Sequence, residues 1–214
     1  MFERRTSKVE LIPESGNLDD YLKETEEIDY SHRLIREKAV ELKENSRDET
    51  EYVKAAFEFV RDNIFHSWDI QSSRVTRKAS EVLLYGEGIC YAKANLLCAL
   101  LRHQGVPAGF CYQKLTLGDT PDSGYAIHAL NGVYLHSRNK WIRLDARGNK
   151  AGVDAQFSMD EEKLAFPVRA HYDEMDYPTI YVSPNKQTMA VLRQYTNCLE
   201  LCKYHLPSNL DTAL

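Results

Sequence analysis

The 214-residue sequence has no internal repeat, no low-complexity segment and no apolar run of about 18 residues or more. Because a helix needs such a run to cross a bilayer, we expect no membrane-spanning segment and no membrane partner. Residues 1–8 also lack the apolar core of a secretory signal, which predicts a cytoplasmic location. The formal charge of −5 excludes a general binder of polyanions, so we expect no nucleic-acid partner.

Cysteine is also scarce. The five cysteines are an odd number and show no regular spacing of a disulfide framework, which indicates free thiols in a reducing compartment. A chain of this length buries about 70% of its unfolded surface without the help of disulfides or metals. We therefore expect a single domain over residues 1–214, with no cofactor and no metal.

One cysteine stands at a junction that favours reactivity. Gly86 and Gly88 end a loop, and Cys90 opens an apolar stretch that continues to Gly105. The first turn of a helix has backbone N–H groups without partners and a partial positive charge, and both stabilise a nucleophilic thiolate. The alternative is a structural cysteine at the start of a buried helix, because free cysteine is among the most buried residue types.

The stretch after Cys90 has helical periodicity. Arg102 and His103 supply a basic last turn, and Gly105 is the expected C-cap. Apolar side chains recur on one face, which we expect to be buried: Cys90, Ala94, Leu97, Cys98 and Leu101. Cys90 heads this face and is therefore expected to point toward a cleft.

A base and an acid follow in the sequence. Among the seven histidines, His128 lies in the segment 125–135, which reads as a strand pair with a turn or bulge at Asn131-Gly132. A further alternating strand, 140–146, contains Asp145 near its end. Strands that are neighbours in sequence usually pair, so the His128 imidazole and the Asp145 carboxylate are expected to meet, the acid orienting the base.

Cys90, His128 and Asp145, in this order, resemble the catalytic triad of the transglutaminase-like branch of the papain-like superfamily. Residues 63–70 resemble a bacterial subgroup described as cysteine proteases. Four motifs carry the resemblance over about residues 52–150: Gly88-Ile89-Cys90-Tyr91-Ala92-Lys93-Ala94, Gly105-Val106-Pro107-Ala108, the histidine strand from His128 to Leu135, and Trp141-Ile142-Arg143-Leu144-Asp145-Ala146. Upstream of them, Ala79-Ser80-Glu81-Val82-Leu83 matches the short helix that precedes the glycine loop in the family. The chain departs from the family pattern at Leu130, where an aromatic residue is common, and at Arg147, where the family more often has a small hydroxyl residue or proline.

The resemblance implies acyl transfer on a protein or peptide substrate. Cys90 would attack an amide carbonyl, His128 would pass the proton to the leaving amine, and Asp145 would hold the imidazolium. Loss of the amine would leave a thioester on Cys90. The backbone N–H of Cys90 is one expected oxyanion donor, and the candidates for the second are side chains upstream: Trp68, His66 and Gln71. A peptidase or amidase is the leading prediction. A protein-glutamine cross-linking transglutaminase and a catalytically silent peptide-binding module of the same fold are the alternatives.

The order of the expected elements indicates an α+β fold. Residues 17–45 form an N-terminal helical segment, a capped helix follows to about residue 64, strands occupy 107–146 and a C-terminal helix runs over about 186–204. The resemblance adds a papain-like, transglutaminase-core arrangement, in which the N-terminal helices and the central nucleophile helix pack on an antiparallel sheet. Three side chains share one face of the last helix, Cys198, Cys202 and His205, but an apolar stripe there favours packing over a metal site.

Overall fold

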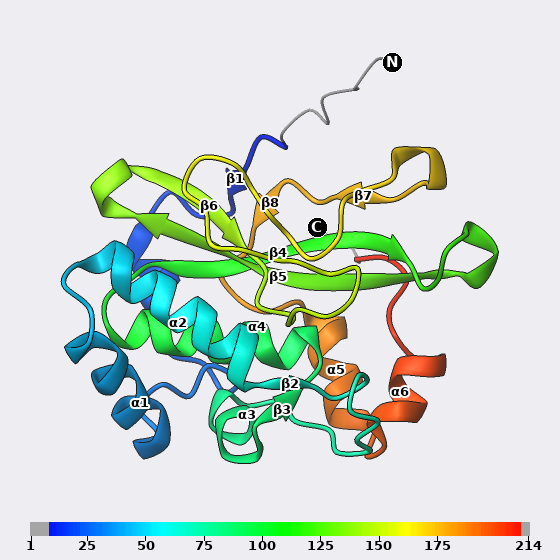
Figure 1. Cartoon of the computed structure of the whole chain (residues 1–214), viewed down its shortest axis with the longest axis horizontal. Coiled ribbons are helices and arrows are strands. Elements are labelled where there is room, and N and C mark those ends of the chain that lie inside the picture. Colours follow the sequence, from blue (N-terminus) through cyan, green and yellow to red (C-terminus); the bar gives the residue numbers. More distant parts are fainter. Residues whose placement is uncertain (1–8, 211–214) are drawn as a thin grey trace.

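A four-stranded antiparallel sheet in the order β6-β5-β4-β7 spans the molecule, and helices cover one of its faces (Figure 1). The computed structural model describes residues 9–210. The strands are β4 (Ala108–Thr116), β5 (Tyr125–Leu135), β6 (Lys140–Leu144) and β7 (Met175–Asp176). Helices precede this sheet along the chain, so the predicted α+β fold class is confirmed.

The central helix α4 (Cys90–His103) lies between the sheet and three further helices. These are α1 (Arg33–Glu44), α2 (Glu49–Asn63) and α3 (Ala79–Tyr85). Every side chain of α4 from Tyr91 to Arg102 is buried, so this helix is enclosed on all sides and not only along the predicted apolar face. No helix within residues 9–210 is long and apolar enough to cross a membrane.

The strands β4 and β5 form a long antiparallel hairpin in which Gln113 lies opposite His128. Both strands lie within residues 107–146, where the sequence predicts strands. The predicted turn or bulge at Asn131-Gly132 is wrong, because β5 continues through both residues and pairs with β4 on one side and β6 on the other.

Tertiary contacts explain why Asn131-Gly132 does not turn. The Asn131 side-chain amide is fully buried and donates hydrogen bonds to the carbonyl oxygens of Ala94 and Gly109, both at 3.1 Å. A Cβ at Gly132 would approach Ile180 Cγ2 to 2.7 Å, so only glycine fits there. The dipeptide therefore serves sheet packing instead of a local turn.

The face of the sheet opposite the helices carries a small parallel pair, β1 (Ile12–Pro13) with β8 (Thr179–Ile180). Ile180 is fully buried there with Tyr21, Cys111 and Leu130 in a second, smaller core. Figure 1 shows this pair above the sheet, with the helices below it.

The N-terminal helical segment is shorter than predicted. Asn17 caps a 3-10 helix, η1 (Leu18–Leu22), by accepting a hydrogen bond from the Asp19 N–H, but residues 23–32 form no helix. The next helix, α1, begins at Arg33. The capped helix predicted to end near residue 64 is α2, and its N-cap is Asp48, whose carboxylate accepts a hydrogen bond from the Glu51 N–H at 2.9 Å.

The C-terminal region contains two helices and not the single helix predicted over 186–204. They are α5 (Lys186–Gln194) and α6 (Cys198–Tyr204). The Asn197 side chain accepts hydrogen bonds from the N–H groups of Leu199 and Glu200 and so caps a new helix. The apolar stripe alone suggests that the first helix continues through this position.

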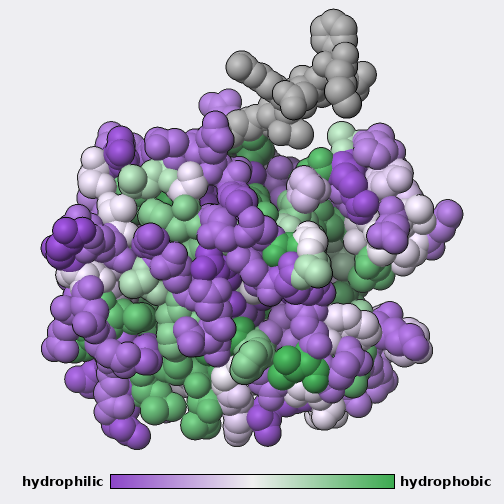
Figure 2. Space-filling model, viewed as in Figure 1, coloured by the Kyte–Doolittle hydropathy of each residue, from purple (hydrophilic) through white to green (hydrophobic). Residues whose placement is uncertain are grey.

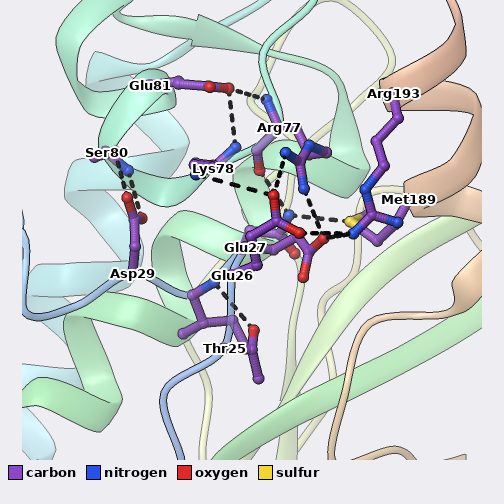
Figure 3. Close-up of polar contacts among 12 residues, drawn as sticks. Thr25, Glu26, Glu27, Asp29, Arg77, Lys78, Ser80, Glu81, Met189 and Arg193 are labelled. Carbon is purple, nitrogen blue, oxygen red and sulfur yellow. Dashed lines mark hydrogen bonds and ion pairs between the residues drawn. The ribbon is translucent and has the colours of Figure 1, made fainter.

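A buried charge cluster fixes α5 against the body of the fold (Figure 3). The Glu27 carboxylate, 6% exposed, receives hydrogen bonds from Arg77 (2.8 Å) and Arg193. Arg77 precedes α3 and Arg193 lies on α5, so one carboxylate joins the segment before α1 to both helices. In the same region, Asp29 accepts from the Ser80 N–H at 3.0 Å.

Candidate active site

Cys90 is the first residue of α4, as predicted. Ile89 is the N-cap and supplies no side-chain hydrogen bond to the first turn. Just before it, Gly88 belongs to β3 (Glu87–Gly88), and a Cβ at this position would lie 2.9 Å from Thr76 Oγ1 and 3.1 Å from Ala92 Cβ. Glycine is therefore required for the chain to enter the helix here, and Cys90 is half-buried at the end of the turn.

A short parallel pair places a second segment beside this turn. β2 (Phe65–His66) pairs with β3, with His66 opposite Gly88, and the Ser67 N–H donates to the Gly88 carbonyl at 3.3 Å. The segment that contains His66 and Trp68 therefore lies next to the segment that contains Cys90.

His128 and Asp145 meet as the sequence predicts. His128 Nε2 lies 2.8 Å from Asp145 Oδ2, and the two residues are 6% and 1% exposed. Asp145 also accepts hydrogen bonds from the backbone N–H groups of Arg147 (3.2 Å) and Ala165 (3.1 Å). With Nε2 directed at the carboxylate, Nδ1 is the ring nitrogen left for the Cys90 thiol.

The electrostatics of the pair favour a charged imidazole. Burial by itself lowers the pKa of His128, but the Asp145 carboxylate and a hydrogen bond with Cys90 raise this pKa to about 10. Burial likewise opposes ionisation of Asp145, yet His128 and the two backbone N–H donors hold the pKa of Asp145 below its usual value. Cys90 therefore shares its cleft with a charged imidazole.

Phe166 and Arg147 surround the imidazole. The Phe166 ring meets the His128 ring edge-on, with centroids 5.2 Å apart. The Arg147 guanidinium lies 5.8 Å from the Phe166 ring and forms a two-bond ion pair with Asp69, one bond at 2.9 Å. Arg147, where the chain departs from the family pattern, thus joins the end of the acid strand to the segment that follows Trp68.

These groups open into one cleft of about 740 Å³. Cys90, His128, His66 and Trp68 all line it. Its walls come from the β4–β5 hairpin, the segment 166–174 and α6. A concave, largely apolar site with a few convergent polar groups is the usual form of a binding or catalytic site.

The structure separates the three oxyanion candidates. Gln71 does not line the cleft, and its side-chain amide donates to the Trp68 carbonyl at 2.6 Å. Trp68 is 38% exposed in the cleft wall, and its indole N–H is an obligate donor. Burial lowers the pKa of His66 well below its usual value, so this imidazole is neutral, and its buried Nδ1 has no hydrogen-bond partner within residues 9–210. His66 and Trp68 are the two remaining candidates for the second oxyanion donor.

The cysteines of α6 do not form a metal centre in the part of the chain that is described. No group of three or more His, Cys, Asp or Glu side chains within residues 9–210 is arranged to hold a metal ion. Cys198 Sγ lies 3.9 Å from Cys202 Sγ, and His205 stacks on Tyr195 with ring centroids 4.1 Å apart.

Lys93 is a charged residue of the site region that sequence reasoning missed. It is 1% exposed on α4, one turn after Cys90, and its ammonium donates a hydrogen bond to the Ile64 carbonyl just before β2. Burial, and the nearby Arg147 charge, lower the pKa of Lys93 to about 7. A lysine near the start of a mostly apolar helix is the signal that points to it in the sequence.

The model of the transglutaminase-like superfamily matches residues 36–146, which is more than half of the chain. No curated protein matches. Three solved structures are similar in fold, and the chain spans less than half the length of each. A candidate cysteine protease from Cytophaga hutchinsonii is 20% identical, with a TM-score of 0.49, over 65% of this chain and 46% of its own.

The other two are more distant. The periplasmic domain of TgpA from Pseudomonas aeruginosa is 18% identical, with a TM-score of 0.44, over 59% of this chain and 45% of its own. A protein named as a TGase is 17% identical, with a TM-score of 0.43, over 77% of this chain and 45% of its own. The family match covers α1 to the end of β6 and includes Cys90, His128 and Asp145. The chain therefore belongs to the transglutaminase-like superfamily.

Proposed function

We propose that the protein is a thiol-dependent hydrolase of peptide or amide bonds in which Cys90 is the nucleophile, His128 the general base and acid, and Asp145 the orienting group. The observation that carries the proposal is the buried His128–Asp145 pair at 2.8 Å, which shares one cleft with a half-buried cysteine at a helix N-terminus. A thiol, a base that lines the same cleft and a carboxylate that orients the base are the groups that a thiol hydrolase needs.

The reaction follows from these roles. The Cys90 thiolate adds to the amide carbonyl carbon, and the oxyanion is stabilised by the Cys90 backbone N–H and a donor from the His66–Trp68 segment. The His128 imidazolium gives its proton to the leaving amine nitrogen, the C–N bond breaks, and a thioester remains on Cys90. His128, now neutral, takes a proton from water, which attacks the thioester and releases the acid and the free thiol.

The first prediction concerns selective alkylation. At pH 6, iodoacetamide is expected to modify Cys90 at least about tenfold faster than Cys202, although both thiols line the cleft. Cys90 is paired with an imidazole, whereas a hydrogen bond with Cys198 and burial raise the pKa of Cys202. Burial also raises the pKa of Cys111 to about 12, so this thiol should stay unmodified.

Peptide mass mapping over time measures the rate at each cysteine. A Cys90→Ser variant should lose the fast phase, and this loss assigns the phase to Cys90. Equal rates at Cys90 and Cys202 would contradict the activated-thiol proposal.

The second prediction separates hydrolysis from cross-linking. When a glutamine-containing peptide is incubated with a labelled primary amine, we expect release of ammonia with little amine incorporation, because Cys90 is only half-buried and water reaches the thioester through the cleft. Mass spectrometry distinguishes the acid product from the amine adduct. Amine incorporation at a rate that matches hydrolysis would favour a transglutaminase, and absence of turnover on all amides would favour a silent binding module.

A further inference from the structure

The cleft wall that continues from His128 is apolar. Ala126 lies two residues before His128 on β5, so both side chains share one face of the sheet, about 7 Å apart. Leu115 lies opposite Ala126 in the register, and Leu117 follows it beyond the end of β4. All three side chains line the cleft, and Ala126 is the smallest of them; we refer to this part of the cleft as the apolar depression.

Two other elements complete the depression. Phe166, which touches the His128 ring, lines it from the segment after the acid strand, and Leu206 lines it from the residues after α6. Leu117 is 49% exposed, an unusual amount of apolar surface beside a functional site. In Figure 2 the right-hand outline of the molecule is indented between the hairpin and α6, and hydrophobic atoms line the indentation.

Two of the charged residues that line the cleft, both arginines, are neutralised within the protein, whereas Asp119 and Lys203 also line it and form no ion pair within residues 9–210. Arg169 binds Glu174 at 2.7 Å and also contacts Thr116 and the carbonyl of Gly118, while Arg147 is paired with Asp69. Burial opposes ionisation of Glu174, but Arg169 and Thr116 lower its pKa to about 2, so this ion pair persists at neutral pH. Neither arginine is available to select a charged substrate.

Resting on the function proposed above, we infer that the depression formed by Leu115, Leu117, Ala126, Phe166 and Leu206 binds a bulky apolar side chain of the substrate, one or two residues from the scissile carbonyl. The substrate class is thus a peptide or amide with a leucine-like or phenylalanine-like side chain near the reacting bond.

The test uses peptidyl chloromethyl ketones, which alkylate a thiolate without any need for turnover. The probes carry leucine, phenylalanine, serine or aspartate at the first or second position from the ketone. After normalisation to the iodoacetamide rate of Cys90, the best apolar probe is expected to react at least about tenfold faster than its aspartate counterpart. Leu117→Asp should lower the rate of the apolar probe about tenfold and leave the iodoacetamide rate unchanged.

Leu84→Asp is the matched control, because Leu84 is 61% exposed on α3 and does not line the cleft. Its rates should equal those of the unmodified protein. Equal reaction of apolar and aspartate probes, or equal effects of Leu117→Asp and Leu84→Asp, would overturn the inference. Selective probe labelling without hydrolysis of the matching peptide amides would support the apolar subsite and overturn the hydrolase function. Failure of the subsite inference and failure of the proposed function therefore give different results.

Discussion

Replacing His128 with alanine is expected to lower kcat at least about 10³-fold and to slow alkylation of Cys90 at pH 6. General acid–base catalysis typically contributes 10²–10⁴-fold, and in the proposed mechanism His128 also stabilises the thiolate. Asp145 keeps two backbone N–H partners in this variant, so its buried carboxylate is not left without hydrogen bonds and the fold is expected to persist. Steady-state kinetics on a peptide amide measure the loss, and circular dichroism verifies the fold.

His136→Ala is the matched control for this experiment. His136 also pairs with a carboxylate, Glu49 at 2.6 Å, but its side chain is 53% exposed and lies outside the cleft. This variant should retain kcat within twofold of the unmodified protein, because exposed ion pairs contribute little. Turnover in His128→Ala within tenfold of the unmodified protein would mean that another residue is the base.

Replacing Lys93 with methionine is expected to raise the free energy of unfolding by about 2 kcal/mol at pH 6. Lysine and methionine have similar lengths, and the pocket around Lys93 is closed to solvent. The free energy of unfolding increases because the variant no longer buries an ammonium group. The increase is reduced by the loss of one hydrogen bond to the Ile64 carbonyl. Urea unfolding followed by fluorescence measures the difference.

The pH dependence of this difference has a defined sign. Burial lowers the pKa of Lys93 from 10.5 to about 7 in the folded protein, so between these values the unfolded chain binds more protons than the folded protein. The stability cost of Lys93 is therefore full below pH 7 and declines as the pH rises toward 10.5. The advantage of Lys93→Met should be largest at pH 6 and close to zero near pH 10.

Lys54→Met supplies the comparison at an exposed lysine. Lys54 is on α2 with its side chain 53% exposed, so its replacement should change stability by less than about 0.5 kcal/mol at every pH. A Lys93→Met protein that is less stable than the unmodified protein at pH 6 would show that the hydrogen bond to Ile64 outweighs the cost of burying the charge.

The parts of the site that were predictable depend on local chemistry. Two glycines before a cysteine, followed by a helical apolar period, are enough to place Cys90 at the start of a helix, because helix initiation is a property of a few consecutive residues. The approach of His128 to Asp145 also follows from sequence order, since neighbouring strands pair antiparallel and Asp145 directly follows β6, which lies beside the His128 strand.

The errors lie where a local signal competes with packing. Asn131-Gly132 is a strong turn signal, yet the Asn131 amide finds buried carbonyl partners and Gly132 leaves room for Ile180, so the strand continues. The apolar stripe over 186–204 suggests one helix, yet the Asn197 side chain caps a second one. In both places the hydrogen bonds of an asparagine side chain determine the local structure, and the hydrophobic periodicity of the sequence does not predict those bonds.

The sequence by itself determined the nucleophile junction, the order of the three candidate catalytic residues and the α+β class, because these depend on short-range pattern and chain order. Only the tertiary structure decided which residues surround the imidazole and shape the cleft. Phe166, Arg147 with Asp69, and the apolar depression along Ala126 come from segments far apart in sequence, and their contacts depend on how loops fold back over the sheet. The same long-range packing made Lys93 a buried charge, since three helices and a strand enclose α4 on every side.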